Sequence, residues 1–303
     1  MKTLIIRPGA IGDTLMVLPG LLDLSRTADI TFAGRQPGLD FVRGFVHRVL
    51  DLESAGWHRL FMETPNCAGL PVSKTDHVVA FFNDKDGRIL KNLKVYFPRT
   101  PVHVFHSFPP EGEHIHMAFY IAACLKSTGL PVDPERAFEK ASAGLVFEGT
   151  HPPTHHDRIL FHPGSGDPQK NHSSDFWLKL IEKYCENITY ASLKKTVLLG
   201  PAERKLLSFY EKRKNFFGFE ISFCPHKNSL LNLLTGSVLY LGHDSGITHL
   251  AAMSGVCTIA LFKETDVRRW SPPGPCVKIV KDSNPCERLI EKILEASSAF
   301  ITA

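Results

Sequence analysis

The sequence lacks several features that would by themselves define a class of protein. Its seven cysteines are widely spaced and form no Cys-x-x-Cys pair, which argues against a disulfide framework or a structural zinc site and favours a reducing compartment. No run approaches the roughly 18 apolar residues of a membrane-spanning helix, and three apolar residues before Arg7 are too few for a signal peptide. We therefore expect a cytoplasmic protein, and peripheral contact with a membrane surface stays open.

Strong charge of one sign is also missing. Lysine and arginine total 35 and aspartate and glutamate total 31, giving a formal net charge of +4. This excess is too small to predict a nucleic-acid binder, but it suits anionic substrates or an anionic membrane surface. The hydrophobic fraction of 43% over 303 residues is typical of a globular chain of about two domains.

Short apolar runs alternate with helix-like segments, which predicts an α/β protein with parallel sheets. The predicted strands cover residues 4–6, 30–33, 78–82, 102–105, 158–161, 196–199, 221–223, 238–241 and 258–262. Helices are predicted near residue 13 and over 116–127, 173–187, 202–214, 246–253 and 286–300. The stretch 151–157, with two prolines, is interpreted as a linker between domains 1–152 and 156–285.

Ligands of open α/β sheets bind beyond the carboxyl ends of the strands, so the loops after strands are the candidate sites. The first such loop carries Gly9, Gly12 and Asp13. It matches neither the Gly-x-Gly-x-x-Gly dinucleotide fingerprint nor the Walker loop. Asp13 is interpreted either as a carboxylate that caps the following helix or as a general base at the mouth of the sheet.

A second loop, residues 162–170, combines small residues with one lysine. Backbone N–H groups at Ser165 and Gly166 are suited to a phosphate, and Lys170 could supply positive charge to a diphosphate. The alternative is a flexible surface loop with a solvated lysine. After a third strand, Glu203 is either a carboxylate of a first helical turn or an acceptor for ribose hydroxyls.

The fourth loop has the densest cluster of polar residues. Ser245 and Gly246 would offer N–H groups at a helix N-terminus, which is a natural phosphate site. Asp244 is suited to sugar hydroxyls, and His249 would lie about one turn into the helix on the same side. A buried histidine with a structural role is the alternative for His249.

In this order, the loops resemble the bacterial heptosyltransferase family, glycosyltransferase family 9. The matching segments are residues 7–15, 162–166 with Lys170, 200–203, 242–252 and 260–270. The resemblance implies a GT-B fold, with two Rossmann-like domains that face a central cleft and a final helix, 286–303, that packs back on the first domain. It also implies an inverting, metal-independent transfer of heptose from ADP-heptose to the inner core of lipopolysaccharide, without a cofactor.

The resemblance assigns a role to each candidate residue. Asp13 matches the catalytic aspartate that deprotonates the acceptor hydroxyl, and Gly9 and Gly12 belong to the acceptor-side loop. Residues that match the donor-binding segments are Ser165, Gly166, Lys170, Glu203, Asp244, Ser245, Gly246 and His249. The implied partners are a nucleotide-sugar donor and a phosphorylated, lipid-linked saccharide at the inner face of the cytoplasmic membrane, with no nucleic acid and no metal, for a chain that acts as a monomer.

Two positions depart from the family pattern. His172 stands where members commonly carry tryptophan, and His243 stands where asparagine is common. Two alternatives keep the fold and change the function: a nucleotide-sugar epimerase, and a non-catalytic protein that binds nucleotide sugars. Asp13 at the position of the family's base favours transfer over the epimerase, and Asp13, Lys170 and Asp244 together argue against the non-catalytic protein.

Overall fold

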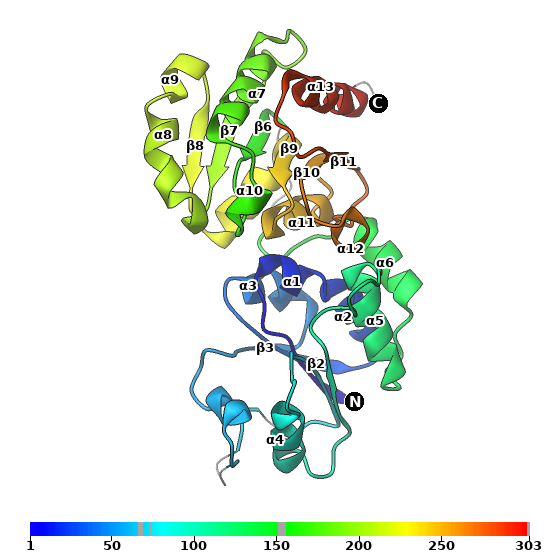
Figure 1. Cartoon of the computed structure of the whole chain (residues 1–303). Helices are drawn as coiled ribbons and strands as arrows, with labels where there is room; N and C mark the ends of the chain where they lie inside the picture. Colours follow the sequence, from blue (N-terminus) through cyan, green and yellow to red (C-terminus); the bar gives the residue numbers. More distant parts are fainter. Residues whose placement is uncertain (66–68, 73, 151–155, 302–303) are drawn as a thin grey trace. The chain divides into compact units, whose positions relative to one another are not determined.

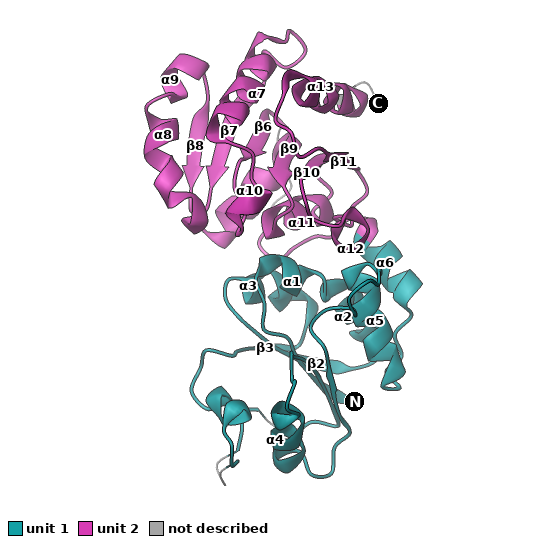
Figure 2. Ribbon diagram, in the orientation of Figure 1, with its two compact units in different colours: residues 1–141 teal, residues 142–303 magenta. Residues whose placement is uncertain are grey.

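The computed structural model describes residues 1–65, 69–72, 74–150 and 156–301. The chain divides into two compact units, residues 1–141 and 142–303 (Figure 2). Each unit is built around a parallel sheet with helices on its faces, as the alternating sequence pattern predicts (Figure 1). Among the described residues, no helix combines the length and the apolar character that crossing a membrane requires.

The first unit has a five-stranded sheet in the order β3-β2-β1-β4-β5, and every neighbouring pair is parallel. Its strands are β1 (Lys2–Ile6), β2 (Asp29–Gly34), β3 (Arg48–Asp51), β4 (His77–Phe81) and β5 (Val102–Phe105). Its helices are α1 (Ile11–Leu15), α2 (Leu18–Leu24), α3 (Gly38–Val42), η1 (Arg43–Phe45), η2 (Trp57–Phe61), α4 (Arg88–Tyr96), α5 (Met117–Ser127) and α6 (Pro134–Ser142). On one face of this sheet, Leu4, Val78 and Ala80 pack with side chains of η2 and α4 in a single core cluster.

The second unit has a six-stranded parallel sheet in the order β11-β10-β9-β6-β7-β8. Its strands are β6 (Arg158–His162), β7 (Lys194–Leu199), β8 (Glu220–Phe223), β9 (Ser237–His243), β10 (Thr258–Phe262) and β11 (Val277–Lys281). Its helices are η3 (Pro168–Lys170), α7 (Ser174–Glu186), η4 (Pro201–Leu206), α8 (Leu207–Glu211), α9 (Lys214–Phe217), α10 (Lys227–Thr235), α11 (Gly246–Met253), α12 (Val267–Trp270) and α13 (Glu287–Ile301). The inner strands are buried on both faces, which is why they appear in the sequence as continuous apolar runs.

The boundary between the units falls earlier in the chain than the predicted linker. Residues after α6 already belong to the second unit: the Leu145 amide donates to the Met253 carbonyl at 2.6 Å, and Phe147 is buried. These contacts hold residues 145–150 on the second unit. Most of the predicted linker, residues 151–155, lies outside the described residues.

The last helix packs within the second unit, and its expected contact with the first domain stays a prediction. Leu289, Ile290 and Ile293 of α13 lie in the core of the second unit, together with Ile259 and Leu261 of β10. The helix has a strongly apolar stripe, and it packs against β10 and β11.

The strand predictions hold for the inner strands, whereas two edge strands, β3 and β11, were missed. The predicted helix 202–214 is three short pieces, η4, α8 and α9. The first predicted helix begins at Ile11 and breaks between α1 and α2, with Pro19 in the first turn of α2. These differences leave the loops that follow the inner strands where the sequence predicts them.

Candidate functional site

Polar residues follow the carboxyl ends of the strands in both sheets. In the first unit, Arg7 follows β1, Asn83 lies just beyond β4, and His106 follows β5. Because β1, β4 and β5 are neighbours in the sheet, these side chains share one edge, and His106 Nε2 lies 3.0 Å from Asn83 Oδ1. This edge is also where the loop with Asp13 begins.

Asp13 is the third residue of α1 and its carboxylate accepts a hydrogen bond from the Ala10 amide at 3.2 Å. The helix begins two residues earlier than predicted, so Ala10 is the N-cap and Asp13 supports the first turn through this bond without being the cap residue itself. The close approach requires a glycine in the loop, since a Cβ at Gly9 would lie 2.5 Å from the Asp13 Cβ. The Asp13 side chain is 24% exposed, so part of it remains open to solvent.

Arg7 supports Asp13 from inside the unit. Its side chain is 1% exposed, and its guanidinium donates to the carbonyls of Asp13 (3.2 Å) and Ser107 (2.9 Å). Its Nη2 also lies 3.6 Å from Asp13 Oδ1. Burial lowers the pKa of Arg7, and the neighbouring Asp13 carboxylate opposes this shift. The arrangement places a fixed positive charge beneath the carboxylate.

In the second unit, the loop after β6 leaves open space beside its backbone. The Ser165 hydroxyl donates to the Asp167 carbonyl at 2.7 Å, which closes a tight turn. Gly166 is exposed, and a methyl group there would meet no atom within 4 Å. The loop thus has the small residues and the free surface that an approaching phosphate needs.

Lys170, Asp244 and His249 are in direct contact. Lys170 Nζ donates to Asp244 Oδ2 at 2.7 Å, and His249 Nε2 lies 3.7 Å from Asp244 Oδ1. Asp244 is 5% exposed, whereas Lys170 is 31% exposed. Burial alone would raise the pKa of Asp244, but the hydrogen bonds with His249 and Lys170 hold it below its ordinary value. The lysine is therefore not a freely solvated side chain.

Glu203 lies against the backbone of the loop that follows β6. Its carboxylate accepts from the Gly200 amide at 2.8 Å and occupies the space beside Gly164, where a Cβ would lie 2.0 Å from Oε1. His162 Nε2 lies 4.0 Å from Glu203 Oε2. Burial raises the pKa of Glu203, and backbone hydrogen bonds partly offset this. The first-turn interpretation of this residue is confirmed, and its contact with ribose stays a prediction.

A buried chain of hydrogen bonds connects β6, β9 and the start of α11. His162 Nδ1 lies 3.0 Å from the Tyr240 hydroxyl, which lies 3.1 Å from Thr248 Oγ1. Ser245 caps α11 by accepting from the Thr248 amide at 3.3 Å. Burial lowers the pKa of His162 to about 4, so this histidine is neutral in the network. The chain of bonds fixes the helix N-terminus at which Ser245 and Gly246 present their backbone.

The two histidines that depart from the family pattern touch each other. The His172 amide donates to His243 Nε2 at 2.9 Å, and their rings are 5.4 Å apart. Burial lowers the pKa of both, to about 4 for His172. His172 is two residues after Lys170, so this bond anchors the end of the segment that carries the lysine.

The structure thus brings most of the predicted donor residues to the carboxyl edge of β6 and β9 in the second unit. Asp13, Gly9 and Gly12 lie together in the first unit, at the end of β1. Tyr240 and Thr248 were not singled out, because Tyr240 falls inside an apolar run that reads as core. Within the described ranges, no three His, Cys, Asp or Glu side chains gather as they would around a metal ion.

Comparison with known proteins gives one family and several similar folds. The model of glycosyltransferase family 9 (heptosyltransferase) matches residues 106–295. No curated protein matches the chain.

Three similar solved structures each share 14% sequence identity with this chain. They are the family 9 glycosyltransferase of Veillonella parvula (TM-score 0.72, 99% of this chain and 97% of that one), heptosyltransferase WaaC of E. coli with ADP (0.68, 99% and 100%) and ADP-heptose lps heptosyltransferase II of E. coli (0.65, 100% and 99%). The expected fold of two parallel-sheet domains, GT-B, is confirmed by these similarities.

Proposed function

The chain belongs to glycosyltransferase family 9, the heptosyltransferase family, and from this premise we propose that it transfers heptose or a similar sugar from ADP-heptose. The observation that carries the proposal is the contact of Lys170, Asp244 and His249 beside the N-terminus of α11. A lysine, a carboxylate and a helix N-terminus at the carboxyl edge of a parallel sheet suit a nucleotide diphosphate with a sugar attached. WaaC, which has a similar fold, was solved with ADP.

In this proposal the second unit holds the donor. The diphosphate lies near Lys170 and the amides of Ser245 and Gly246, with the open backbone at Ser165 and Gly166 beside it. As negative charge develops on the leaving ADP, the ammonium and the helix N-terminus stabilise it, so no metal is required. The Asp244 carboxylate accepts hydrogen bonds from the sugar hydroxyls, His249 forms a further hydrogen bond with the sugar, and the Glu203 carboxylate accepts hydrogen bonds from the ribose hydroxyls.

Asp13 acts as the general base. It removes the proton of the acceptor hydroxyl, whose oxygen attacks the anomeric carbon from the face opposite ADP. The bond from the anomeric carbon to the phosphate oxygen breaks, ADP leaves with the electron pair, and the configuration inverts. Arg7 holds the carboxylate in place from below, and positioning of this kind contributes much of the rate of a displacement.

The proposed acceptor is the lipid-linked, phosphorylated inner core of lipopolysaccharide, reached at the inner face of the cytoplasmic membrane. A net charge of +4 supports contact with both anionic substrates and an anionic surface. The chain would act as a monomer that binds the membrane peripherally and would need no cofactor.

The test is a screen of ADP-, UDP- and GDP-sugars with lipid A precursors as acceptors, in the presence and absence of a chelator. We expect transfer from ADP-heptose that the chelator does not reduce, with an inverted anomeric configuration in the product by NMR. Asp13→Asn should bind ADP as the wild type does and lose turnover, because it keeps the size and the hydrogen bond of the side chain but not its basicity.

Other outcomes would identify the alternatives. A donor whose sugar changes configuration without any acceptor would indicate an epimerase. Tight ADP binding with no reaction on any acceptor would favour a non-catalytic binding protein. Undiminished transfer by Asp13→Asn would remove the base from the mechanism while leaving the donor site intact.

A further inference from the structure

Two cysteines that lie 19 positions apart in the sequence come together in the second unit. Cys257 Sγ and Cys276 Sγ are in contact, with 2.6 Å between them. Each cysteine immediately precedes a strand, β10 or β11, and the parallel register pairs Thr258 with Val277. The Thr258 amide also donates to the Cys276 carbonyl at 2.9 Å. The pairing of the two strands therefore sets the cysteines side by side.

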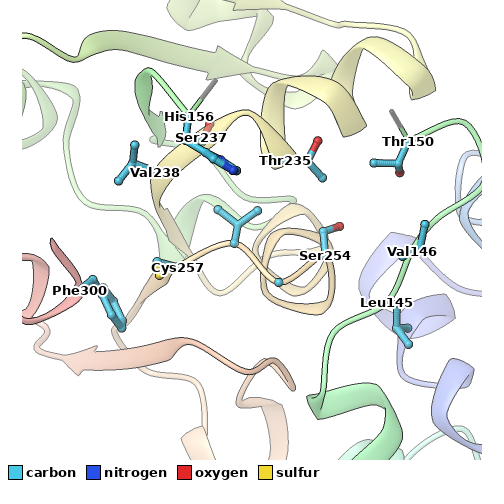
Figure 3. A pocket seen from close by; sticks show the side chains of 12 residues that line it. Leu145, Val146, Thr150, His156, Thr235, Ser237, Val238, Ser254, Cys257 and Phe300 are labelled. Atoms are coloured by element: carbon cyan, nitrogen blue, oxygen red, sulfur yellow. The ribbon is translucent and has the colours of Figure 1, made fainter. Parts of the chain in front are cut away.

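The site is at the amino ends of the strands, at the opposite edge of the sheet from the donor residues. Cys257 lines a cavity of about 610 Å³, together with Ser237, Ser254, Val256 and Phe300 (Figure 3). A space of this size is comparable to sites that hold small molecules. Both cysteines are only partly buried. The cavity gives a small reagent a route to the Cys257 sulfur.

We propose that Cys257 and Cys276 are a thiol–disulfide exchange site that takes a low-molecular-weight disulfide and becomes an intramolecular disulfide. One cysteine, as thiolate, attacks the small disulfide, forms a mixed disulfide and releases one small thiolate. The other cysteine loses its proton and attacks the protein sulfur of that mixed disulfide, which releases the second small thiolate. In total, two protein thiols and one small disulfide give one protein disulfide and two small thiols.

The reaction has a clear structural consequence. β11 is at an edge of the sheet and, in the described part of the chain, has β10 as its one neighbouring strand. The new bond would close residues 257–276 into a covalent loop that contains all of β10 and would fasten the edge strand at its start. Closing a loop of this length restricts the unfolded chain and stabilises the folded unit. Burial raises the pKa of Cys257, so the exchange should accelerate as the pH rises, because the thiolate is the reacting form.

Trypsin offers a direct assay, since it separates the two cysteines into peptides 228–263 and 270–278, each with one cysteine. The reduced full-length protein is incubated with oxidised glutathione, the remaining thiols are alkylated, and the digest is examined by mass spectrometry. We expect these two peptides to appear joined, and to separate after treatment with dithiothreitol. The oxidised protein should also unfold at a temperature higher by roughly 5–10 °C, the order expected for such a loop.

Three variants serve as controls. Cys257→Ser and Cys276→Ser should each accumulate a glutathione adduct on the remaining cysteine and show no rise in unfolding temperature. Cys286→Ser removes an exposed cysteine elsewhere and should leave the joined peptides unchanged. The proposal is overturned if the two peptides stay separate in the wild type while glutathione reacts at other cysteines. It is equally overturned if Cys257 or Cys276 pairs with a different cysteine. None of these results depends on glycosyl transfer.

Discussion

Replacing Lys170 with alanine tests whether this lysine belongs to the proposed donor site or is an ordinary surface lysine. The substitution removes an ammonium that lies 2.7 Å from Asp244 Oδ2. It should therefore weaken ADP binding, and it should also destabilise the second unit, because Asp244 is then left with His249 alone at 3.7 Å. A solvated lysine in a flexible loop would produce neither effect.

The expected magnitudes follow from the exposure of the two partners. Removing one member of a fully buried ion pair costs about 3–5 kcal/mol. Lys170 is 31% exposed, so water can reach the vacated side of the carboxylate, and we expect about 1–2 kcal/mol in the free energy of unfolding. A charge-assisted hydrogen bond to the diphosphate is worth about 1.5–3 kcal/mol. Because Lys170 gives up part of its bond to Asp244 on binding ADP, the lower end applies, and the Kd should rise about tenfold.

Titration calorimetry with ADP and chemical unfolding measure the two quantities. Lys179→Ala is the matched control, since Lys179 is an exposed lysine on α7 of the same unit. It should change the Kd by less than twofold and leave the free energy of unfolding within about 0.5 kcal/mol. The double variant Lys170→Ala with Asp244→Asn should recover stability relative to Lys170→Ala, because no unpaired buried charge remains.

The pH dependence of stability tests whether the loss in Lys170→Ala comes from the Asp244 carboxylate. The pKa of Asp244 is lowered in the folded protein, so its contribution to stability is present above the ordinary carboxylate pKa of about 4 and is lost as the pH falls through the lowered value. The difference in stability between the wild type and Lys170→Ala should therefore shrink in acid. An unchanged Kd in Lys170→Ala, or an equal loss in Lys179→Ala, would refute the reasoning.

Two more substitutions test the units separately. The side chain of Asp23 is fully buried, and its hydrogen bond with Arg136, with help from Lys140, lowers its pKa. Asp23→Asn should reduce the free energy of unfolding of the first unit by about 2 kcal/mol in urea at pH 7, since the partners are partly exposed. The reduction should become progressively smaller as the pH falls from about 4 toward the lowered pKa of Asp23, because the unfolded chain then binds a proton that the folded one does not. His243→Leu removes the acceptor of the His172 amide and should cost about 1–3 kcal/mol in thermal unfolding and weaken ADP binding, whereas His243→Asn, which keeps an acceptor, should cost less.

The fold could be predicted wherever a strand is buried on both faces. β10, which is buried throughout, has the bounds that its apolar run indicates. The edge strand β5 is only partly buried, and the apolar residues of its short run still predict its bounds. β3 and β11 escaped prediction because they are edge strands whose charged residues, such as Arg48 and Lys278, interrupt the apolar pattern. For α13, the sequence predicts the helix and its apolar stripe but not the surface that the stripe covers, because that depends on which strands lie at the sheet edge.

The candidate site was predictable in its location but not in its contacts. The rule that ligands bind after the carboxyl ends of strands selects the loops with Lys170 and Asp244. Lys170 and Asp244 are 74 positions apart in the sequence. They form an ion pair because the strands that precede their loops, β6 and β9, are neighbours in the sheet. Sequence spacing contains no signal for that adjacency, and it also conceals Tyr240, whose hydroxyl joins the buried network.

His172 and His243, the two positions expected to depart from the family pattern, also form a contact that the sequence alone does not reveal. His172 and His243 are 71 positions apart and look like independent changes in the sequence, yet one donates its amide to the ring of the other. Burial keeps both rings neutral by lowering their pKa values. Since neither ring adds charge, the electrostatics of a diphosphate site here still depend on Lys170 and the N-terminus of α11. The two histidines therefore act together as a neutral packing contact, which leaves the proposed donor chemistry to the charged groups of the site.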